Sequence, residues 1–361
     1  MDYCKLGSSD LEVSKVCMGT MTFGNQNTRE EGVAQLNTAF DDYGINFLDT
    51  AELYPVPPNK ESCGDTDRIV AEFLKGRNRH DVIVATKVCG RAPHINWMSR
   101  AQPETPAQLN KEQILHSVDA SLERLGGIDH IDLLQLHWPD RYTGGLFGQP
   151  DFTSSQFQED YNAFEDILSA LQQVVDEGKV RYIGVSNETP FGVCSMADLA
   201  KNHPTLYPKI VSIQNSYSLV VRKDFEAGLA ESCYHHKVGL LSYSPLAAGS
   251  LSGKYRKPDE VSDNARLKKF PGFMDRYLGS VNEAAVNAYA TLAEDINMTP
   301  TQLALSWCYH REHVASTIIG ATTMDQLHEN IQSYDIRLDD EAMDKIGEIY
   351  KQYTDPTKAR N

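Results

Sequence analysis

The sequence predicts a single-domain α/β fold, a (β/α)8 barrel (TIM barrel), over residues 1–361. Short apolar runs alternate with amphipathic helical stretches, and this alternation is typical of a parallel sheet. Eight such runs occur, and no change of composition divides the 361 residues. Barrels of this class commonly exceed about 200 residues as one unit, so the length does not require a second domain.

An N-terminal hairpin precedes the barrel pattern. Two short extended pieces, Tyr3–Leu6 and Leu11–Val13, flank the polar turn at residues 7–10. The runs that follow are expected to form the eight barrel strands. They are Lys15–Gly19, Asn46–Thr50, Val82–Lys87, Ile131–His137, Val180–Ser186, Ile210–Asn215, Leu240–Ser244 and Thr317–Gly320.

Helices are expected between these strands. Apolar residues at three- or four-residue spacing predict helices over Glu31–Tyr43, Lys111–Leu125 and Phe164–Glu177, each followed by glycine. Two more, Val281–Ile296 and Asp340–Tyr353, exceed the count for a minimal barrel. We expect them to pack outside the barrel as accessory helices.

Three stretches are too long to be simple connections: Cys89–Leu109, Trp138–Tyr161 and Leu246–Ser280. Each follows a predicted strand, so each lies on the face of the barrel where active sites are built. We expect substrate specificity to reside in these loops.

Composition narrows the possible partners. The net charge of −16 argues against nucleic acid, because a phosphate backbone needs a basic surface. No run of about 18 apolar residues occurs, so no membrane span is expected. Seven scattered cysteines without a Cys-x-x-Cys pair favour a reducing compartment. Without an apolar signal core we expect a cytoplasmic protein, or a plastid protein if a transit peptide was removed. No obligate protein partner is evident.

Several other chemistries are disfavoured. The histidine pairs at 235–236 and at 310 and 313 lack a third ligand at useful spacing, so no metal is expected. The chain has no Gly-x-Gly-x-x-Gly, which argues against a Rossmann domain. It also lacks the Tyr-x-x-x-Lys device of the short-chain dehydrogenases.

Ionisable residues stand at the carboxyl ends of three successive predicted strands. Asp49 ends the second, Lys87 the third and His137 the fourth. Tyr54 stands five positions after Asp49. Each has an ordinary structural explanation, such as capping a helix or reaching water with a long side chain. Because these strand ends share one rim, all four residues are expected to meet there.

Such a set has a chemical purpose. A free phenol has a pKa near about 10 and is a poor proton donor at neutral pH. A nearby ammonium is expected to lower that pKa, a carboxylate to keep the ammonium charged, and a histidine to hold a substrate oxygen. The four residues therefore suit donation of a proton to a carbonyl oxygen.

In this order and on this fold, the four residues resemble the catalytic tetrad of the aldo-keto reductases. Segments along nearly the whole chain are similar to the same family, most of all to its bacterial Tas-like branch and the plant plastid relatives of that branch. Potassium-channel β-subunits are similar at a greater distance. The segments are "MGTMTFG" (18–24), "GKVRYIGVSN" (178–187), "IQNSYSL" (213–219), "SYSPLAAGSLSGKY" (242–255) and "STIIGATTMDQLHENI" (316–331).

The resemblance implies an NADPH-dependent reduction of aldehydes and ketones to alcohols, with NADH as a possible substitute. Tyr54 would donate the proton and Lys87 would tune it. Asp49 would hold Lys87, and His137 would orient the carbonyl. No metal is needed. Independently of the resemblance, Trp138 directly follows His137 and is expected to wall the substrate pocket, together with Arg141, Tyr142 and Phe147 of the same long loop.

The resemblance also implies a cofactor site. Many family members carry an arginine for the 2′-phosphate where this chain has Gln326, so Lys254 and Arg266 are the basic candidates here. By position, the carboxamide would be held by Ser186, Asn187 and Gln214, the nicotinamide ring by Tyr243, the pyrophosphate by Ser244, Leu246, Gly249 and Lys254, and the adenosine end by Gly320, Thr322, Gln326, Glu329 and Asn330.

One alternative belongs to a different class. The chain could be a redox-sensing regulatory subunit that binds NADPH tightly and turns over slowly, as the potassium-channel β-subunits do. A retained tetrad does not separate the two functions. The chain begins at the hairpin without a long N-terminal extension, which favours the enzyme.

Overall fold

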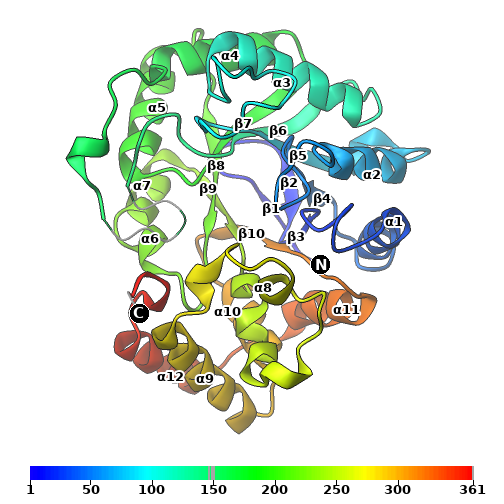
Figure 1. The fold of residues 1–361 in the computed structure, drawn as a ribbon, viewed down its shortest axis with the longest axis vertical. Coiled ribbons are helices and arrows are strands. Elements are labelled where there is room, and N and C mark those ends of the chain that lie inside the picture. The colour runs from blue at the N-terminus through cyan, green and yellow to red at the C-terminus, as the bar shows by residue number, and fades with distance from the viewer. Residues whose placement is uncertain (145–146, 148–150, 360–361) are drawn as a thin grey trace.

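The computed structural model describes residues 1–144, 147 and 151–359 and contains a closed barrel of parallel strands (Figure 1). The strands follow one another around the barrel in chain order, and β10 closes it against β3. The predicted fold is confirmed, although the last strand begins at Val314, before the expected Thr317. The barrel strands are β3 (Val16–Gly19), β4 (Phe47–Asp49), β5 (Ile83–Val88), β6 (Ile131–Leu136), β7 (Val180–Ser186), β8 (Ile210–Ser216), β9 (Gly239–Tyr243) and β10 (Val314–Ile319).

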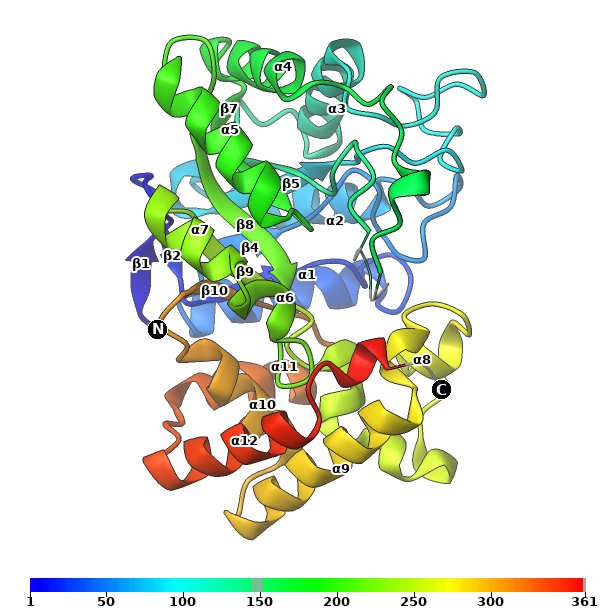
Figure 2. The ribbon, with the colours of Figure 1, turned by 90° about the vertical axis from the view of Figure 1, so that its left-hand side faces the viewer.

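Helices surround the barrel. The helix expected over Glu31–Tyr43 is divided, because α1 ends at Asn37 and Thr38–Asp42 continue as one π-helical turn. The two accessory helices, α9 and α12, pack against each other outside the barrel (Figure 2). The α-helices are α1 (Arg29–Asn37), α2 (Asp65–Leu74), α3 (Lys111–Arg124), α4 (Phe164–Asp176), α5 (Pro190–Asn202), α6 (Lys223–Glu226), α7 (Leu229–His236), α8 (Arg266–Lys269), α9 (Ser280–Asp295), α10 (Pro300–Tyr309), α11 (Met324–Gln332) and α12 (Asp340–Gln352).

The strand period of two sorts the side chains of each strand between two cores. On β6, Leu133 joins the apolar cluster inside the barrel, whereas Leu134 and Leu136 join the larger cluster between strands and helices. Gln135 therefore shares the inward face with Leu133, one layer closer to the carboxyl end. The barrel interior is thus apolar toward the amino-terminal ends of the strands. It is polar in the layer near their carboxyl ends, where the candidate site lies.

The predicted hairpin closes the amino-terminal end of the barrel. β1 (Tyr3–Lys5) and β2 (Glu12–Ser14) pair antiparallel, and Leu6, Leu11 and Val13 pack with the interior cluster. Gly7 lies at the turn with φ of +55°, and a Cβ there would come within 2.0 Å of the Val211 carbonyl oxygen. Only glycine fits this close approach, which lets the hairpin act as a plug.

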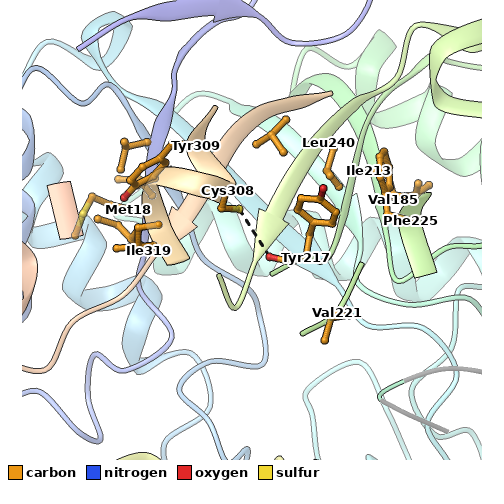
Figure 3. Packing of buried hydrophobic residues seen from close by; sticks show 14 of the residues in the cluster. Met18, Val185, Ile213, Tyr217, Val221, Phe225, Leu240, Cys308, Tyr309 and Ile319 are labelled. Carbon is orange, nitrogen blue, oxygen red and sulfur yellow. Dashed lines mark hydrogen bonds between the residues drawn. The ribbon is translucent and has the colours of Figure 1, made fainter. Parts of the chain in front are cut away.

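The outer core packs helices onto the strands. Figure 3 shows Cys308 of α10 beside Tyr217, which directly follows β8; the thiol donates to the Tyr217 carbonyl oxygen at 3.8 Å. The Tyr217 ring stacks on Trp307 with centroids 5.2 Å apart. All seven cysteines are free thiols. Within the described part of the chain, no helix is long and apolar enough to cross a membrane.

Candidate active site

A cavity of about 1280 Å³ opens at the carboxyl ends of the barrel strands. Its wall includes Gly19, Asp49, His137 and Ser186, which stand at or just after the ends of four of these strands. Tyr54 and Trp138 also line it, as do all fourteen residues predicted to bind the cofactor. Lys87 lies beneath the cavity, where it is 1% exposed.

Lys87 connects the acid to the phenol. Its ammonium forms an ion pair with Asp49 Oδ2, donates to the Thr50 carbonyl at 2.9 Å and donates to the Tyr54 hydroxyl at 3.4 Å. Burial alone would lower the pKa of Lys87, but the charge of Asp49 and the contact with Tyr54 outweigh it and raise that pKa. The ammonium therefore stays charged beneath the phenol.

Tyr54 differs from the expectation in one respect. The Lys87 ammonium does favour phenolate, but burial of the hydroxyl is the larger effect, and the pKa of Tyr54 is raised from its ordinary value. The expected net lowering is therefore wrong. The phenol is fully protonated at neutral pH, which suits a group that gives a proton rather than accepts one.

His137 stands opposite Tyr54. It directly follows β6, where its backbone N–H donates to the Val88 carbonyl at 2.8 Å, and its ring meets the Tyr54 ring edge-on with centroids 5.9 Å apart. Burial, with help from the Lys87 charge, holds the pKa of His137 well below its usual range. The imidazole is therefore neutral and has one N–H to donate. Nδ1 lies 3.9 Å from Cys89 Sγ, and Nε2 makes no hydrogen bond to a described residue.

Gln135 is a site residue that the sequence analysis missed. Its amide donates to Asp49 Oδ1 at 3.0 Å, and the Gln214 amide donates to the same oxygen at 2.8 Å. Gln214 also donates to Gln135 Oε1 at 3.0 Å. Asp49 is thus held by Lys87 on one oxygen and by two amides on the other. The signal was available, because Gln135 and His137 are two positions apart on one strand and so face the same way.

Asn187 joins the catalytic end of the cavity to the predicted nicotinamide platform. Its backbone has φ of 53°, an uncommon conformation for a residue with a side chain. Its amide donates to the His137 carbonyl at 2.8 Å, and its Oδ1 accepts from the Tyr243 hydroxyl at 2.7 Å. The Tyr243 ring is thereby positioned on the wall of the cavity.

The loop after β9 has a strained backbone where it lines the cavity. Ser244, Ala247, Ala248 and Gly249 have φ of 54°, 48°, 56° and 91°. Three of these residues are not glycine, so their left-handed backbone conformations are strained. Strained conformations persist only where the surrounding structure enforces them, and they cluster at ligand sites. The Ala247 and Gly249 backbone N–H groups donate to the Ser244 and Leu246 carbonyls, each at 2.8 Å, which fixes this backbone at the wall of the cavity. The residues present therefore fit the dinucleotide that the resemblance implies.

Two cations stand over this loop. Neither Lys254 nor Arg266 has a carboxylate within 4.0 Å among the described residues. Arg266 Nε donates to Gln26 Oε1 at 3.3 Å, a neutral partner that the sequence analysis did not single out. Burial lowers the pKa of the Arg266 guanidinium from its ordinary value, although it remains charged. Cations that line the cavity without a carboxylate partner among the described residues favour a phosphate ligand.

Local hydrogen bonds organise the residues that are predicted to contact the adenosine end. Gln326 Oε1 accepts from the Thr322 backbone at 2.9 Å and from its hydroxyl at 3.0 Å. Glu329 accepts from the Thr299 hydroxyl at 2.6 Å, and Asn330 donates to the Gly320 carbonyl at 3.2 Å. Gln326 therefore orders the turn before α11.

Two of the predicted substrate-pocket residues lie elsewhere. Arg141 is buried in a two-point ion pair with Glu188, at 2.6 and 3.0 Å, and Tyr142 accepts from the Thr153 backbone at 3.1 Å. Neither lines the large cavity, whereas Trp138 and Phe147 do. Arg141 was assigned from its position in a long loop, which does not show that its charge is already neutralised.

A second buried ion pair anchors the loop over the cavity. Glu52 accepts from Arg100 at 2.6 and 3.1 Å, from the Cys89 backbone at 2.7 Å and from Ser117 at 2.6 Å. It thereby joins the segment between Asp49 and Tyr54 to the Cys89–Leu109 loop. That loop also packs its own apolar cluster around Ala92, Ile95 and Met98, with Leu53. Among the described residues, no cluster of histidine, cysteine or acidic side chains could hold a metal ion.

Comparison with known proteins agrees with this geometry. The sequence pattern of the Aldo/keto reductase family matches residues 15–351. "Protein tas" of Escherichia coli (strain K12) is 41% identical over 357 residues, which cover 99% of both chains. An "Aldo-keto reductase" of Babesia bovis is 37% identical over 77% of this chain and 98% of its own. A "Probable voltage-gated potassium channel subunit beta" of Arabidopsis thaliana is 29% identical over 97% of this chain and 96% of its own.

Proposed function

The chain belongs to the aldo/keto reductase family, and on that premise we propose that it reduces aldehydes and ketones to alcohols with NADPH. The observation that carries this proposal is the position of the Lys87 ammonium. It pairs with Asp49 and donates to the Tyr54 hydroxyl at 3.4 Å, directly beneath the cavity. A buried, charged lysine under a protonated phenol is an arrangement for delivering a proton.

The proposed roles follow from this geometry. A bound nicotinamide supplies the hydride. Tyr54 donates its proton to the carbonyl oxygen, and the Lys87 charge stabilises the phenolate that remains. The neutral His137 donates a hydrogen bond to the same oxygen and orients it. Asp49 keeps Lys87 charged and aimed, with Gln135 and Gln214 holding its second oxygen.

On the cofactor side, NADPH is the proposed partner. Lys254 and Arg266 lie beside the loop with left-handed backbone, and the described residues give them no carboxylate. Arginine suits a phosphate because its planar fork makes two charge-assisted hydrogen bonds. We assign Arg266 to the 2′-phosphate and Lys254 to its support. A small carbonyl compound in the cytoplasm completes the proposal.

The test is turnover of NADPH by purified protein over a panel of aldehydes and ketones, with the alcohol product identified. We expect repeated turnover with at least one carbonyl and none without one. Tyr54→Phe is the matched control, because it retains the ring and removes the proton. If variant and wild type consume NADPH equally, the oxidation does not use this site.

The second candidate is a redox-sensing subunit that keeps its cofactor. The similarity to proteins named as probable channel subunits favours considering it. Single-turnover kinetics separate the two functions. An enzyme exchanges oxidised cofactor quickly and continues, whereas a sensor reduces one equivalent of carbonyl and then holds the oxidised form.

A further inference from the structure

Arg276 lies at the substrate end of the cavity and has no role in the proposed reaction. We propose that it anchors the negatively charged end of the substrate, so that the enzyme selects carbonyl compounds that carry a carboxylate or a similar anion. This inference rests on the proposed function and adds the substrate class to it.

The position of Arg276 is defined by two cavities. It belongs to a 3-10 turn, Asp275–Tyr277, in the long loop after β9. A second cavity of about 150 Å³ adjoins the large one, and Arg276 lines both. Phe147, Asn187 and Tyr243 also line both. Its guanidinium therefore stands where the two cavities meet, beside the tyrosine assigned to the nicotinamide.

The charge of Arg276 is not neutralised by the described part of the chain. The Arg276 guanidinium donates to the Tyr277 hydroxyl at 3.2 Å and to the Phe147 carbonyl at 3.4 Å, and both partners are neutral. No carboxylate of a described residue comes within 4.0 Å. Its guanidinium carbon lies 4.7 Å from the Tyr277 ring centroid, a contact that steadies the side chain.

Three of the other charged groups along this side are already paired, whereas Asp275, which also lines the large cavity, accepts from the Gly272 backbone at 3.2 Å and has no cation of a described residue within 4.0 Å. Glu188 in the small cavity pairs with Arg141, and Asp224 pairs with Lys358. In the large cavity, Arg91 contacts Asp140 at 3.5 Å and Asp160 at 3.2 Å. Arg276 is therefore the substrate-side arginine whose charge the described residues leave for a ligand. In a chain with a net charge of −16, a cation left open inside a cavity is not a general surface property.

A continuous line of rings leads from the tetrad to Arg276. The Tyr54 and His137 rings are 5.9 Å apart, those of His137 and Trp138 4.8 Å, and those of Trp138 and Phe147 6.4 Å. Arg276 donates to the carbonyl of that same Phe147. A substrate with its carbonyl at Tyr54 would therefore lay its apolar body along Trp138 and Phe147 and reach Arg276 with its other end.

The small cavity offers polar groups beyond the guanidinium. Thr143 Oγ1 and Asn215 Oδ1 are buried there and have no hydrogen-bond partner among the described residues. Buried polar atoms are normally paired, so these two point to a ligand or to water. The Thr143 hydroxyl can donate to an anion, and Asn215 can accept from a hydroxyl next to it. The site therefore fits an anionic, oxygen-rich end of a substrate.

The test compares two aldehydes of nearly equal shape, 4-carboxybenzaldehyde and 4-formylbenzamide, by kcat/KM with saturating NADPH. We expect wild type to prefer the carboxylate. Arg276→Gln should lower kcat/KM for the carboxylate by about tenfold to a hundredfold, the range for a hydrogen bond to a charged group, and lower it much less for the neutral amide. Arg276→Lys should recover part of the loss, because it restores the charge without the fork.

Three results would overturn the proposal. Equal kcat/KM for the two aldehydes in wild type would show that no anion is selected. An equal loss for both in Arg276→Gln, or a raised Kd for NADPH, would assign Arg276 to the loop or the cofactor. Failure of wild type to reduce either aldehyde or any other carbonyl would instead remove the proposed function, and this inference with it.

Discussion

The Gln214 amide donates a hydrogen bond of 2.8 Å to Asp49 Oδ1. Gln214 is also assigned to the nicotinamide carboxamide, and its Oε1 accepts no hydrogen bond from a described residue. On the proposed function, one side chain would therefore join the cofactor to the acid that holds Lys87. Gln135 braces the pair, since it donates to Asp49 and accepts from Gln214.

Gln135→Leu should slow turnover, although Gln135 is not assigned a contact with the substrate. The change removes one of two amide donors from Asp49 Oδ1, and a hydrogen bond to a charged group is worth about 1.5–3 kcal/mol. We expect kcat to fall about tenfold or more with KM nearly constant. Steady-state kinetics checks this. Thr86→Val is the matched control: Thr86 is equally buried on the adjacent strand, and its hydroxyl makes no hydrogen bond to a described residue, so kcat should not change.

Tyr54→Phe should keep cofactor binding and lose most reduction. Phenylalanine preserves the ring, which lies 4.9 Å from the Lys87 ammonium, and removes only the proton. A positioned general acid contributes about 10²–10⁴-fold, so kcat should fall within that range. Fluorescence titration of NADPH and a kcat measurement on a good aldehyde are sufficient. Near-full turnover in the variant would assign the proton to another group.

Lys87→Met should lower kcat and move the alkaline limb of its pH profile to higher pH. The sign follows from the charges: burial raises the pKa of Tyr54, and Lys87 opposes that rise. Without the ammonium the pKa rises further, so Tyr54 stays protonated to higher pH but gives its proton less readily. An alkaline limb at unchanged pH would show that Lys87 does not affect the pKa of Tyr54.

A stability control belongs with that variant. Removing Lys87 leaves Asp49 buried with one charge partner fewer, which costs about 3–5 kcal/mol in comparable buried pairs. The double variant Lys87→Met with Asp49→Asn removes the stranded charge. We expect it to recover stability in urea unfolding and to recover no turnover, because the phenol still lacks its ammonium.

The sequence was sufficient for the barrel and for the prediction that Asp49, Tyr54, Lys87 and His137 lie together at one rim. Strand periodicity placed Asp49 and Lys87 at strand ends, and parallel strands carry their ends to one rim. It was not sufficient for Glu52 and Arg100. Their pairing depends on how a long loop folds back over the barrel, and no period or motif encodes that path.

Two misjudgements have a similar origin. Arg141 looked available because a sequence shows charges without their partners, and Glu188 is remote in the chain yet 2.6 Å away. The net pKa of Tyr54 was misjudged because burial, unlike the neighbouring Lys87, cannot be read from spacing. In both cases, the outcome depends on which groups surround the side chain in the folded protein.

Glu52→Gln should make the protein less stable at neutral pH. Burial alone would raise the pKa of Glu52, but Arg100, the Cys89 backbone and Ser117 together outweigh it and lower that pKa. A depressed folded pKa gives stability above the unfolded value near about 4.3, and that stability is lost as pH falls through the folded value. The variant should lose about 3–5 kcal/mol at pH near 7, and the gap should narrow in acid.

Urea unfolding at several pH values measures this gap. Glu61→Gln is the control, since Glu61 is exposed in the same segment and forms no ion pair with a described residue. A gap that stays constant down to strongly acid pH would mean that Glu52 acts through packing rather than charge.

Arg266→Ala should weaken NADPH binding much more than NADH binding. Arg266 lines the cavity, and the only hydrogen-bond partner of its side chain among the described residues is the neutral Gln26. Gln326 already accepts from Thr322. NADH has no 2′-phosphate to lose, so the difference between the cofactors isolates that contact. The expected differential loss is about 1.5–3 kcal/mol.

Fluorescence titration of both cofactors against wild type and variant gives this difference directly. Arg256→Ala is the matched control: it lies in the same loop but is exposed and paired with Glu294 at 2.6 Å, so both affinities should be unchanged. An equal loss of NADPH and NADH in Arg266→Ala would assign Arg266 to the pyrophosphate or to the loop fold. Any preference for NADPH would then arise near Thr322 and Thr323, where hydroxyls and the α11 N-terminus can meet a phosphate.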